Sequence, residues 1–276
     1  MKARAALAVL MLVVAAAYGL WRIDVLPGWW DLTHWGLDVE EVAERARSAH
    51  RADRLRVFEQ EAAAARMHAF DERAAGGALD TLDDRATVAF IGSSTIERFD
   101  VGAAFPGVRA LDRGIGDERA ELMAARLDVG MDWPEVDGVV VYAGSVDFRR
   151  VGVGAAATVL RAEKVLDGIA ARAPGKPVLV LGLLSQRDLE DDRGGDGPPA
   201  LVGRRSLEAV NLGLEAAAAE RGFGFLPLDR SPLTAPDGTL DEAYAADRLH
   251  LNRDGYQVLT EWIRKNGGPL SALLFP

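Results

Sequence analysis

The chain has 276 residues and a formal net charge of −10, and it contains four histidines and no cysteine. Its length suits one α/β domain with additional segments, because single domains commonly contain about 100 to 250 residues. The absence of cysteine excludes a disulfide framework, a thiolate metal site and a cysteine nucleophile. Catalysis must therefore rely on Ser, Thr, Asp, Glu, His or Lys. The excess of 42 acidic over 32 basic residues argues against a surface that binds nucleic acid.

The N-terminal region of the chain contains a candidate membrane segment. Residues 5–21 form an uncharged, apolar run, AALAVLMLVVAAAYGLW, that follows Lys2 and Arg4. Its length is at the lower edge of what crosses a bilayer and near the upper edge of a signal-peptide core. Small residues at positions 15–17 would suit cleavage, whereas the tryptophans between positions 21 and 35 favour retention at the membrane interface. We expect retention, and a cleaved signal peptide is the alternative.

This interpretation divides the N-terminal region into a pair of segments and gives the chain an orientation. A signal anchor or transmembrane helix covers residues 1–21, and a Trp-rich interfacial segment covers residues 22–37. The positive-inside rule places Lys2 and Arg4 in the cytoplasm. The remainder would be exported to the periplasm or the extracellular side, and the chain would be a single-pass protein of the cell membrane.

The segment from Asp38 to about Ala75 is rich in Ala, Glu and Arg and lacks Pro and Gly, which favours helix. We expect a helical connector over residues 38–85 that packs on the domain after it. A dimerising coiled coil is the alternative, although the heptads do not persist. Three of the four histidines lie between positions 34 and 68, without a shared metal-ligand spacing.

From residue 86 onward, short apolar runs alternate with stretches of helical length and composition. The expected strands are Thr87–Ile91, Val108–Leu111, Gly138–Ala143, Pro177–Leu184 and Phe223–Leu228, and the expected helices are 118–127, 155–172 and 201–221. Apolar strands separated by helices are typical of a parallel sheet covered on both faces. The sequence therefore predicts a three-layer α/β/α domain over residues 86–276, with a mostly parallel five-stranded sheet of flavodoxin-like type. Ligands of such sheets bind at the carboxyl ends of the strands.

Two polar groups stand where chemistry is expected in such a domain. Ser93 and Ser94 follow the first strand at the start of a helix, where the helix dipole favours an anionic intermediate; an ordinary turn and helix cap is the alternative. Asp247 and His250 lie within one turn, so the carboxylate can hold one ring nitrogen while the other acts as a general base. His250 is the only histidine after position 69, so a serine–histidine mechanism here has a single candidate base.

From about Thr87 onward, four segments together resemble the SGNH, or GDSL-like, hydrolase family. FIGSSTIERF resembles the subgroup with Gly-Ser-Ser in place of Gly-Asp-Ser, and LDRGIGD is similar to the family's Asn-Arg-Gly-Ile-Gly-Gly segment. VYAGSVD stands where the family has Gly-x-Asn-Asp, and Asp247-x-x-His250 precedes the typical Leu-Asn-x-x-Gly-Tyr run. The resemblance implies an SGNH-type fold with Ser94 as nucleophile, His250 as base and Asp247 as its orienting partner. It implies no metal and no organic cofactor.

The resemblance also implies where an oxyanion would bind, and the sequence departs from the family there. The family uses a backbone N–H of the second segment and an asparagine amide of the third segment, together with the N–H of the nucleophile. The candidate residues here are Gly116, Asp117, Gly144, Ser145 and Val146. Asp117 stands where the family has glycine, and Val146 stands where it has asparagine. Loss of one such side-chain donor typically lowers turnover about 100- to 1,000-fold, and Ser145 is a candidate substitute donor.

These observations predict a membrane-anchored, exported serine esterase that acts on O-acyl or short-chain esters, including those of carbohydrates. The expected partners are a small-molecule or carbohydrate ester and the membrane, contacted through residues 5–21, with no nucleic acid. A catalytically impaired binding or scaffold protein of the cell envelope is one alternative, and an O-acyltransferase that uses the same residues is another. Arg149 and Arg150 would either bind an anionic part of the substrate or form a solvated loop.

Overall fold

The computed structural model describes residues 84–151, 153–186 and 204–276. The expected anchor over residues 1–21, the Trp-rich segment over residues 22–37 and residues 38–83 of the connector lie outside the described residues. These assignments therefore stay predictions. Within the portion of the chain that the structure describes, none of the helices has the length and apolar character needed to span a bilayer.

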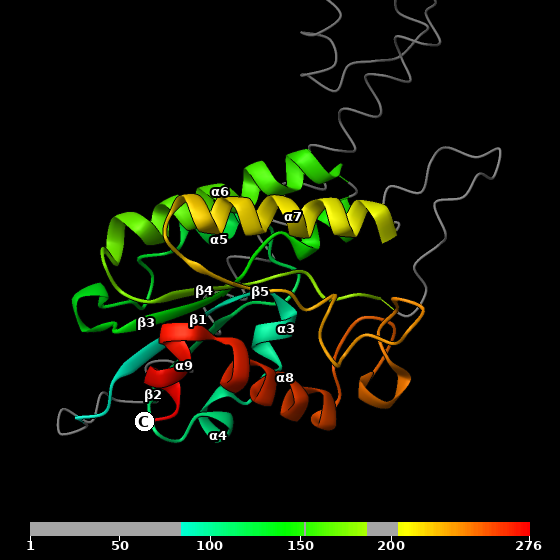
Figure 1. The fold of residues 1–276 in the computed structure, drawn as a ribbon. Coiled ribbons are helices and arrows are strands. Elements are labelled where there is room, and N and C mark those ends of the chain that lie inside the picture. The colour runs from blue at the N-terminus through cyan, green and yellow to red at the C-terminus, as the bar shows by residue number, and fades with distance from the viewer. Residues whose placement is uncertain (1–83, 152, 187–203) are drawn as a thin grey trace, which may run out of the picture. The chain divides into compact units, whose positions relative to one another are not determined.

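Five parallel strands form one sheet, in the order β2-β1-β3-β4-β5 (Figure 1). They are β1 (Thr87–Gly92), β2 (Arg109–Gly114), β3 (Gly138–Tyr142), β4 (Val178–Leu181) and β5 (Gly224–Leu226). Every residue of β1, β3 and β4 is buried, because helices cover both faces of the sheet. The five expected strands and the parallel arrangement are confirmed.

Helices cover the two faces of the sheet and complete the expected three layers (Figure 1). One face carries α5 (Ala120–Ala125), α6 (Ala155–Arg172) and α7 (Arg204–Glu220). The other carries α3 (Ser94–Glu97), α4 (Val101–Ala104), α8 (Arg253–Asn266) and α9 (Gly268–Leu274). Short helical turns lie at η3 (Trp133–Glu135), η4 (Asp147–Val151) and η5 (Glu242–Tyr244). Helix α6 buries Ala162, Val165, Leu166 and Ile169, which recur at the spacing of one helix face.

The strand order places a topological switch beside β1, because β1 has β2 on one side and β3 on the other. In open α/β sheets, ligands bind outside the carboxyl ends of the strands at such a switch. The register pairs Gly92 at the end of β1 with Gly114 of β2 and with Tyr142 of β3. The segments that follow these three strands therefore leave the sheet at the same edge.

The ends of β2 and β4 differ most from the sequence prediction, by three residues each. Strand β2 continues to Gly114, three residues beyond the expected end at Leu111, although Asp112 and Arg113 look like loop residues. Several polar groups of this segment find partners in the strand: the Gly114 N–H donates to Asp112 Oδ1 at 2.8 Å, and the terminal nitrogens of Arg113 donate to the Asp112 and Gly130 carbonyls.

Strand β4 ends at Leu181, whereas the sequence predicted an end at Leu184. Beyond this end, the side-chain amide of Asn211 on α7 pairs with the backbone of Leu183, as a neighbouring strand would. Its oxygen accepts from the Leu183 N–H at 2.6 Å and its nitrogen donates to the Leu183 carbonyl at 3.1 Å. Apolar residues after Leu181 are thus buried outside the sheet, which sequence pattern alone does not distinguish from a longer strand.

Candidate active site

The turn after β1 presents Ser94 at the start of helix α3. The carbonyl of Ser93 accepts from the N–H groups of Ile96 and Glu97, both at 3.0 Å, so the helix begins directly after the strand. Helix α3 also lies against β2: a Cβ atom added at Gly114 would be 2.1 Å from the backbone nitrogen of Glu97. Glycine at 114 therefore permits the close approach that fixes the helix carrying Ser94 over the edge of the sheet.

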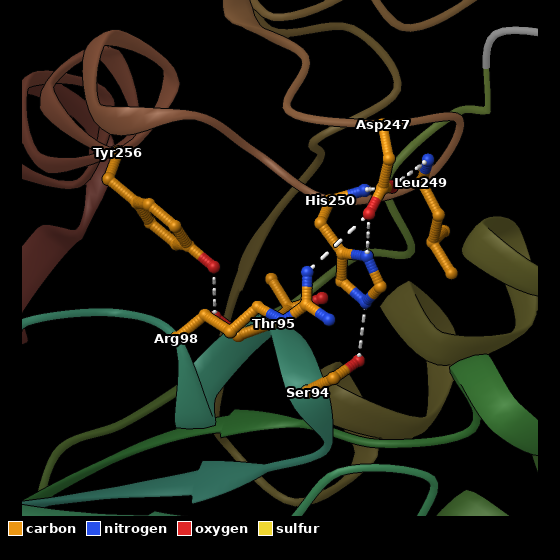
Figure 2. Close-up of polar contacts among 7 residues, drawn as sticks. All are labelled: Ser94, Thr95, Arg98, Asp247, Leu249, His250 and Tyr256. Atoms are coloured by element: carbon orange, nitrogen blue, oxygen red, sulfur yellow. Dashed lines mark hydrogen bonds and ion pairs between the residues drawn. The ribbon is translucent and has the colours of Figure 1, made fainter.

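The structure brings Ser94, His250 and Asp247 into one chain of hydrogen bonds (Figure 2). Ser94 Oγ lies 2.9 Å from His250 Nε2, and His250 Nδ1 lies 2.7 Å from Asp247 Oδ2. Because a carboxylate accepts from Nδ1–H, Nε2 is left to accept the proton of the Ser94 hydroxyl. The His250 side chain is only 15% exposed, whereas Asp247 is 48% exposed.

Backbone groups of the same loop fix the Asp247 carboxylate. Its Oδ1 accepts from the N–H groups of Leu249 and His250, both at 2.8 Å. Partial burial alone would raise the pKa of Asp247, but these two N–H groups and the His250 ring stabilise the charged form and hold the pKa well below its usual range. The carboxylate therefore stays ionised at neutral pH and can stabilise a protonated His250.

The loop that carries Asp247 and His250 is held at both ends. Ala245 and Leu251 form an antiparallel bridge, and the Ala246 N–H donates to the His250 carbonyl at 2.8 Å. Asn252 ties the loop to helix α8, because its oxygen accepts from the Gly255 N–H at 2.9 Å and its amide donates to the loop before His250. The Leu-Asn-x-x-Gly-Tyr run is thus the N-cap and first turn of α8.

Tyr256 on α8 connects the segment after the Asp247–His250 loop to the helix that carries Ser94. Its hydroxyl donates to the carbonyl of Thr95, the residue after Ser94, at 2.8 Å (Figure 2). Its ring stacks on Phe99 with the ring centroids 4.9 Å apart. Burial raises the pKa of Tyr256, so the phenol remains a donor. The sequence prediction did not include this residue among the site residues, and its place in the Leu-Asn-x-x-Gly-Tyr run was the signal that pointed to it.

The loops after β2 and β3 each contain a residue with a positive φ angle. Asp117 adopts a φ of 59° and Gly144 a φ of 96°, both in the left-handed region that favours glycine. Asp117, which stands where the resemblance places a glycine, thus adopts a glycine-like φ, and its side chain is exposed. The Ile115 N–H donates to the Gly92 carbonyl at 3.0 Å, which places the segment with Gly116 beside the end of β1.

The segment after β3 supplies no asparagine amide. Val146 is half-buried and its side chain has no hydrogen-bond donor. The hydroxyl of Ser145 lies 2.9 Å from that of Ser93, and both side chains are buried. Ser93 thus contacts the third segment and does not cap α3. The Ser93–Ser145 hydrogen bond joins the turn that carries Ser94 to the loop that carries Val146.

Asp147 is a further residue whose role the sequence reasoning missed. Its fully buried carboxylate accepts from the Ala120 N–H at 2.8 Å and pairs with Arg161 at 3.0 Å. It thereby joins the loop after β3 to the first residue of α5, directly after the segment with Gly116 and Asp117. Only its position in the third segment could have marked it.

Arg149 and Arg150 were the remaining candidates for substrate binding. Arg149 is half-buried and donates to the Leu184 carbonyl beyond the end of β4, and the side chain of Arg150 lies outside the described residues. Within the described ranges, acidic and histidine side chains do not gather in a group of three that would suit a metal ion.

Comparison of the sequence with known families decides the affiliation. Residues 75–258 match the model of the GDSL-like Lipase/Acylhydrolase family. The chain belongs to this family. The match includes both the Ser94 turn and the Asp247–His250 loop, so the hydrogen-bonded residues described above lie within the family domain. No protein among the curated ones matches this sequence.

Solved structures show the same fold. A protein from Streptococcus pneumonia whose name refers to platelet activating factor aligns with a TM-score of 0.63 and 19% identity, over 78% of this chain and 98% of its own. A GDSL-like lipase from Bacteroides thetaiotaomicron aligns with a TM-score of 0.58 and 16% identity, over 73% of this chain and 96% of its own. A lipase/acylhydrolase from Enterococcus faecalis aligns with a TM-score of 0.52 and 15% identity, over 65% of this chain and 94% of its own.

Proposed function

We propose that this member of the GDSL-like family is a serine esterase that hydrolyses O-acyl or short-chain esters. Ser94 is the nucleophile, His250 is the general base and then the general acid, and Asp247 orients His250. The observation that carries the proposal is the continuous hydrogen-bond chain from Ser94 Oγ through the His250 ring to Asp247. Its two distances are those of a nucleophile–base–orienting-group arrangement.

The first half of the reaction acylates Ser94. As Ser94 Oγ bonds to the ester carbonyl carbon, its proton moves to His250 Nε2, and the carbonyl π electrons move to oxygen. Asp247 stabilises the imidazolium that forms, because its carboxylate is fixed 2.7 Å from Nδ1. The tetrahedral intermediate then expels the alcohol, which takes the proton from Nε2, and the acyl group remains on Ser94.

The second half restores the enzyme by the same groups. Water loses a proton to His250 Nε2 as its oxygen bonds to the acyl carbon, and the proton passes to Ser94 Oγ when the acyl–oxygen bond breaks. The acid leaves and the hydrogen-bond chain reforms. The site requires only that water reach His250, and the half-buried state of Ser94 and His250 is consistent with that access.

Backbone N–H groups provide the oxyanion donors in this proposal. The N–H of Ser94 stands at the start of α3, and the hydrogen bond from the Ile115 N–H to the Gly92 carbonyl supports a place for the second segment beside the same strand end. With Val146 in place of an amide side chain, turnover is expected to be about 100- to 1,000-fold below that of a site with all donors.

The valine at position 146, in place of an amide side chain, favours a second function. A family domain without the third donor is also suited to bind an ester-bearing envelope component without turning it over. This binding or scaffold function predicts a folded protein that neither hydrolyses activated esters nor reacts with a serine-directed probe.

We also propose that the domain is exported and anchored in the cell membrane by residues 5–21. The apolar run behind Lys2 and Arg4 and the tryptophans after it support this proposal. Carbonate extraction of membranes that contain the full chain, followed by N-terminal sequencing, tests it. Retention in the pellet with Met1 or Lys2 at the N-terminus supports an anchor, whereas a soluble form that begins near Tyr18 contradicts it.

Hydrolysis of p-nitrophenyl acetate by purified protein tests the enzymatic function. Replacement Ser94→Ala should lower kcat by a factor of about 10⁴ or more, as typical for loss of the nucleophile. Ser93→Ala is the matched control, because it removes the neighbouring hydroxyl, and turnover should remain measurable. Absence of turnover in the folded wild-type protein would favour the binding function, and equal activity of the wild type and Ser94→Ala would refute the assignment of the nucleophile.

A further inference from the structure

Arg98 places a positive charge beside the candidate active site. It follows Ser94 by four residues at the end of α3, so the two side chains leave the helix on the same side. Figure 2 shows the guanidinium extending toward the Asp247–His250 pair, with its Nη1 3.5 Å from Asp247 Oδ2. The side chain is 49% exposed, so solvent and a ligand can reach it.

The contact with Asp247 is too weak to explain why an arginine stands at position 98. At 3.5 Å it is at the limit of an ion-pair hydrogen bond, and exposed pairs of this kind contribute about 0 to 1 kcal/mol. Asp247 already accepts three shorter hydrogen bonds, of 2.7 to 2.8 Å, from its own loop and from His250. A cation at this position also opposes the positive charge that His250 acquires during the reaction.

An anionic group of a bound ligand would offset the repulsion between Arg98 and the protonated His250. The planar guanidinium has five N–H donors and is weakly hydrated, so it binds carboxylates and phosphates better than a lysine would. A negative group held by Arg98 would offset its charge beside His250 while the substrate is bound. The chain as a whole is acidic, with a net charge of −10, and Arg98 places a cation next to the nucleophile.

The charges around Ser94 also distinguish the two ends of an ester. Glu97 turns toward the segment after β2, since a Cβ atom added at Gly116 would lie 2.7 Å from Glu97 Oε2. This carboxylate disfavours a permanently charged anionic substituent on that side, whereas the transient oxyanion would be bound by the backbone N–H groups. Arg98 instead contacts the pair whose His250 Nε2 must protonate the departing alcohol.

We propose that Arg98 binds an anionic group on the alcohol portion of the substrate, so that the preferred esters are those of alcohols that bear a carboxylate or a phosphate. The inference rests on the proposed function, because the alcohol end is defined by the proton that His250 delivers. It makes Arg98 a specificity-determining residue of the site.

Two acetyl esters with the same ring test the proposal. 3-Acetoxybenzoate carries a carboxylate on the leaving alcohol, and 3-acetoxybenzamide is its neutral counterpart. The wild type should prefer the benzoate in kcat/KM, and Arg98→Gln should lower the benzoate-to-benzamide ratio on the order of tenfold, as typical for loss of a hydrogen bond to a charged group. Arg98→Lys should retain some of the preference, and 0.5 M salt should weaken the wild-type preference.

A matched control separates this effect from a general loss of charge. Arg230 is also an exposed arginine beside a carboxylate, at 3.4 Å from Glu215, and Arg230→Gln should leave the ratio unchanged. If Arg98→Gln lowers kcat/KM for both esters equally, the arginine only positions Asp247 and the proposal is refuted.

Equilibrium binding tests the proposal without turnover. Calorimetry with 3-acetoxybenzoate should show Kd on the order of tenfold weaker for Ser94→Ala/Arg98→Gln than for Ser94→Ala. A difference of this size supports the anion site even when the wild type does not hydrolyse esters, in which case only the proposed esterase function fails. Equal affinities, or no binding to Ser94→Ala, would overturn the anion site whatever the esterase activity.

Discussion

Replacement of Tyr256 by phenylalanine tests how the His250 loop and the Ser94 helix are held together. The change removes the hydroxyl group, which donates to the Thr95 carbonyl at 2.8 Å, and it leaves the ring that stacks on Phe99 with the ring centroids 4.9 Å apart. Tyr256 does not belong to the hydrogen-bond chain of Ser94, His250 and Asp247, so we regard it as a positioning residue. Its loss should therefore affect the rate of the chemical step more than the binding of a small ester.

The magnitude follows from the contact that is lost. A neutral hydrogen bond contributes about 1 kcal/mol to stability, and a buried acceptor left without a donor costs about 1 to 3 kcal/mol. Thr95 is buried, so the free energy of unfolding should fall by about 1 to 2 kcal/mol and Tm by roughly 3 to 6 °C. A loosened Ser94–His250 contact should lower kcat for p-nitrophenyl acetate by about three- to tenfold, with KM changed by less than about twofold.

Urea unfolding and steady-state kinetics at a temperature where both proteins are folded measure these quantities. Tyr256→Leu is the comparison variant, because it removes the stacked ring as well and should lose more stability than Tyr256→Phe. A wild-type free energy of unfolding in Tyr256→Phe, or a loss of activity that appears entirely in KM, would refute the positioning role of Tyr256.

Three further changes test other features of the site. Asp147→Ala should lower the free energy of unfolding by about 2 to 3 kcal/mol in urea titrations, because it leaves the buried Ala120 N–H without an acceptor and removes the partner of Arg161; a loss below about 1 kcal/mol would contradict this. Val146→Asn should raise kcat about 10- to 100-fold if the missing amide limits turnover, and an unchanged kcat would show that another group has replaced it. The lowered pKa of Asp247 means that its ionised form contributes stability above about pH 4, which is lost as the pH falls below that value toward the folded-state pKa; Asp247→Asn should reduce the change in unfolding free energy between pH 5 and pH 3, and an identical change in both proteins would argue against it.

Much of the fold could be predicted because the sheet is covered on both faces. Strands β1 and β3 are buried at every residue, so each appears in the sequence as an uninterrupted apolar run. The end of β2 could not be predicted in the same way, since Arg113 is buried and reaches the Gly130 carbonyl, 17 residues later, only in the folded chain. The end of β4 depends on Asn211, which approaches from a helix 28 residues later.

The sequence predicted three residues of the candidate site and their roles, but not all of the contacts that hold the site together. The positions of Ser94, His250 and Asp247 follow from their sequence motifs, whereas the 2.9 Å contact between Ser94 and His250 joins residues 156 positions apart. Tyr256 reaches the Thr95 carbonyl across 161 positions, and nothing in a Gly-Tyr dipeptide indicates that partner. A single arginine in a short polar helix likewise resembles an ordinary solvated residue until the fold places it beside Asp247.

The central claim is that Ser94 is a nucleophile activated by His250, and covalent labelling measures this most directly. The folded protein should react with a fluorophosphonate probe at neutral pH, and mass spectrometry should locate the adduct on the peptide that contains Ser94, at one label per chain. His250→Ala should slow labelling by at least about 100-fold, and Ser93→Ala should leave the adduct on the same residue. An unlabelled folded protein, or an adduct on another serine, would contradict the account.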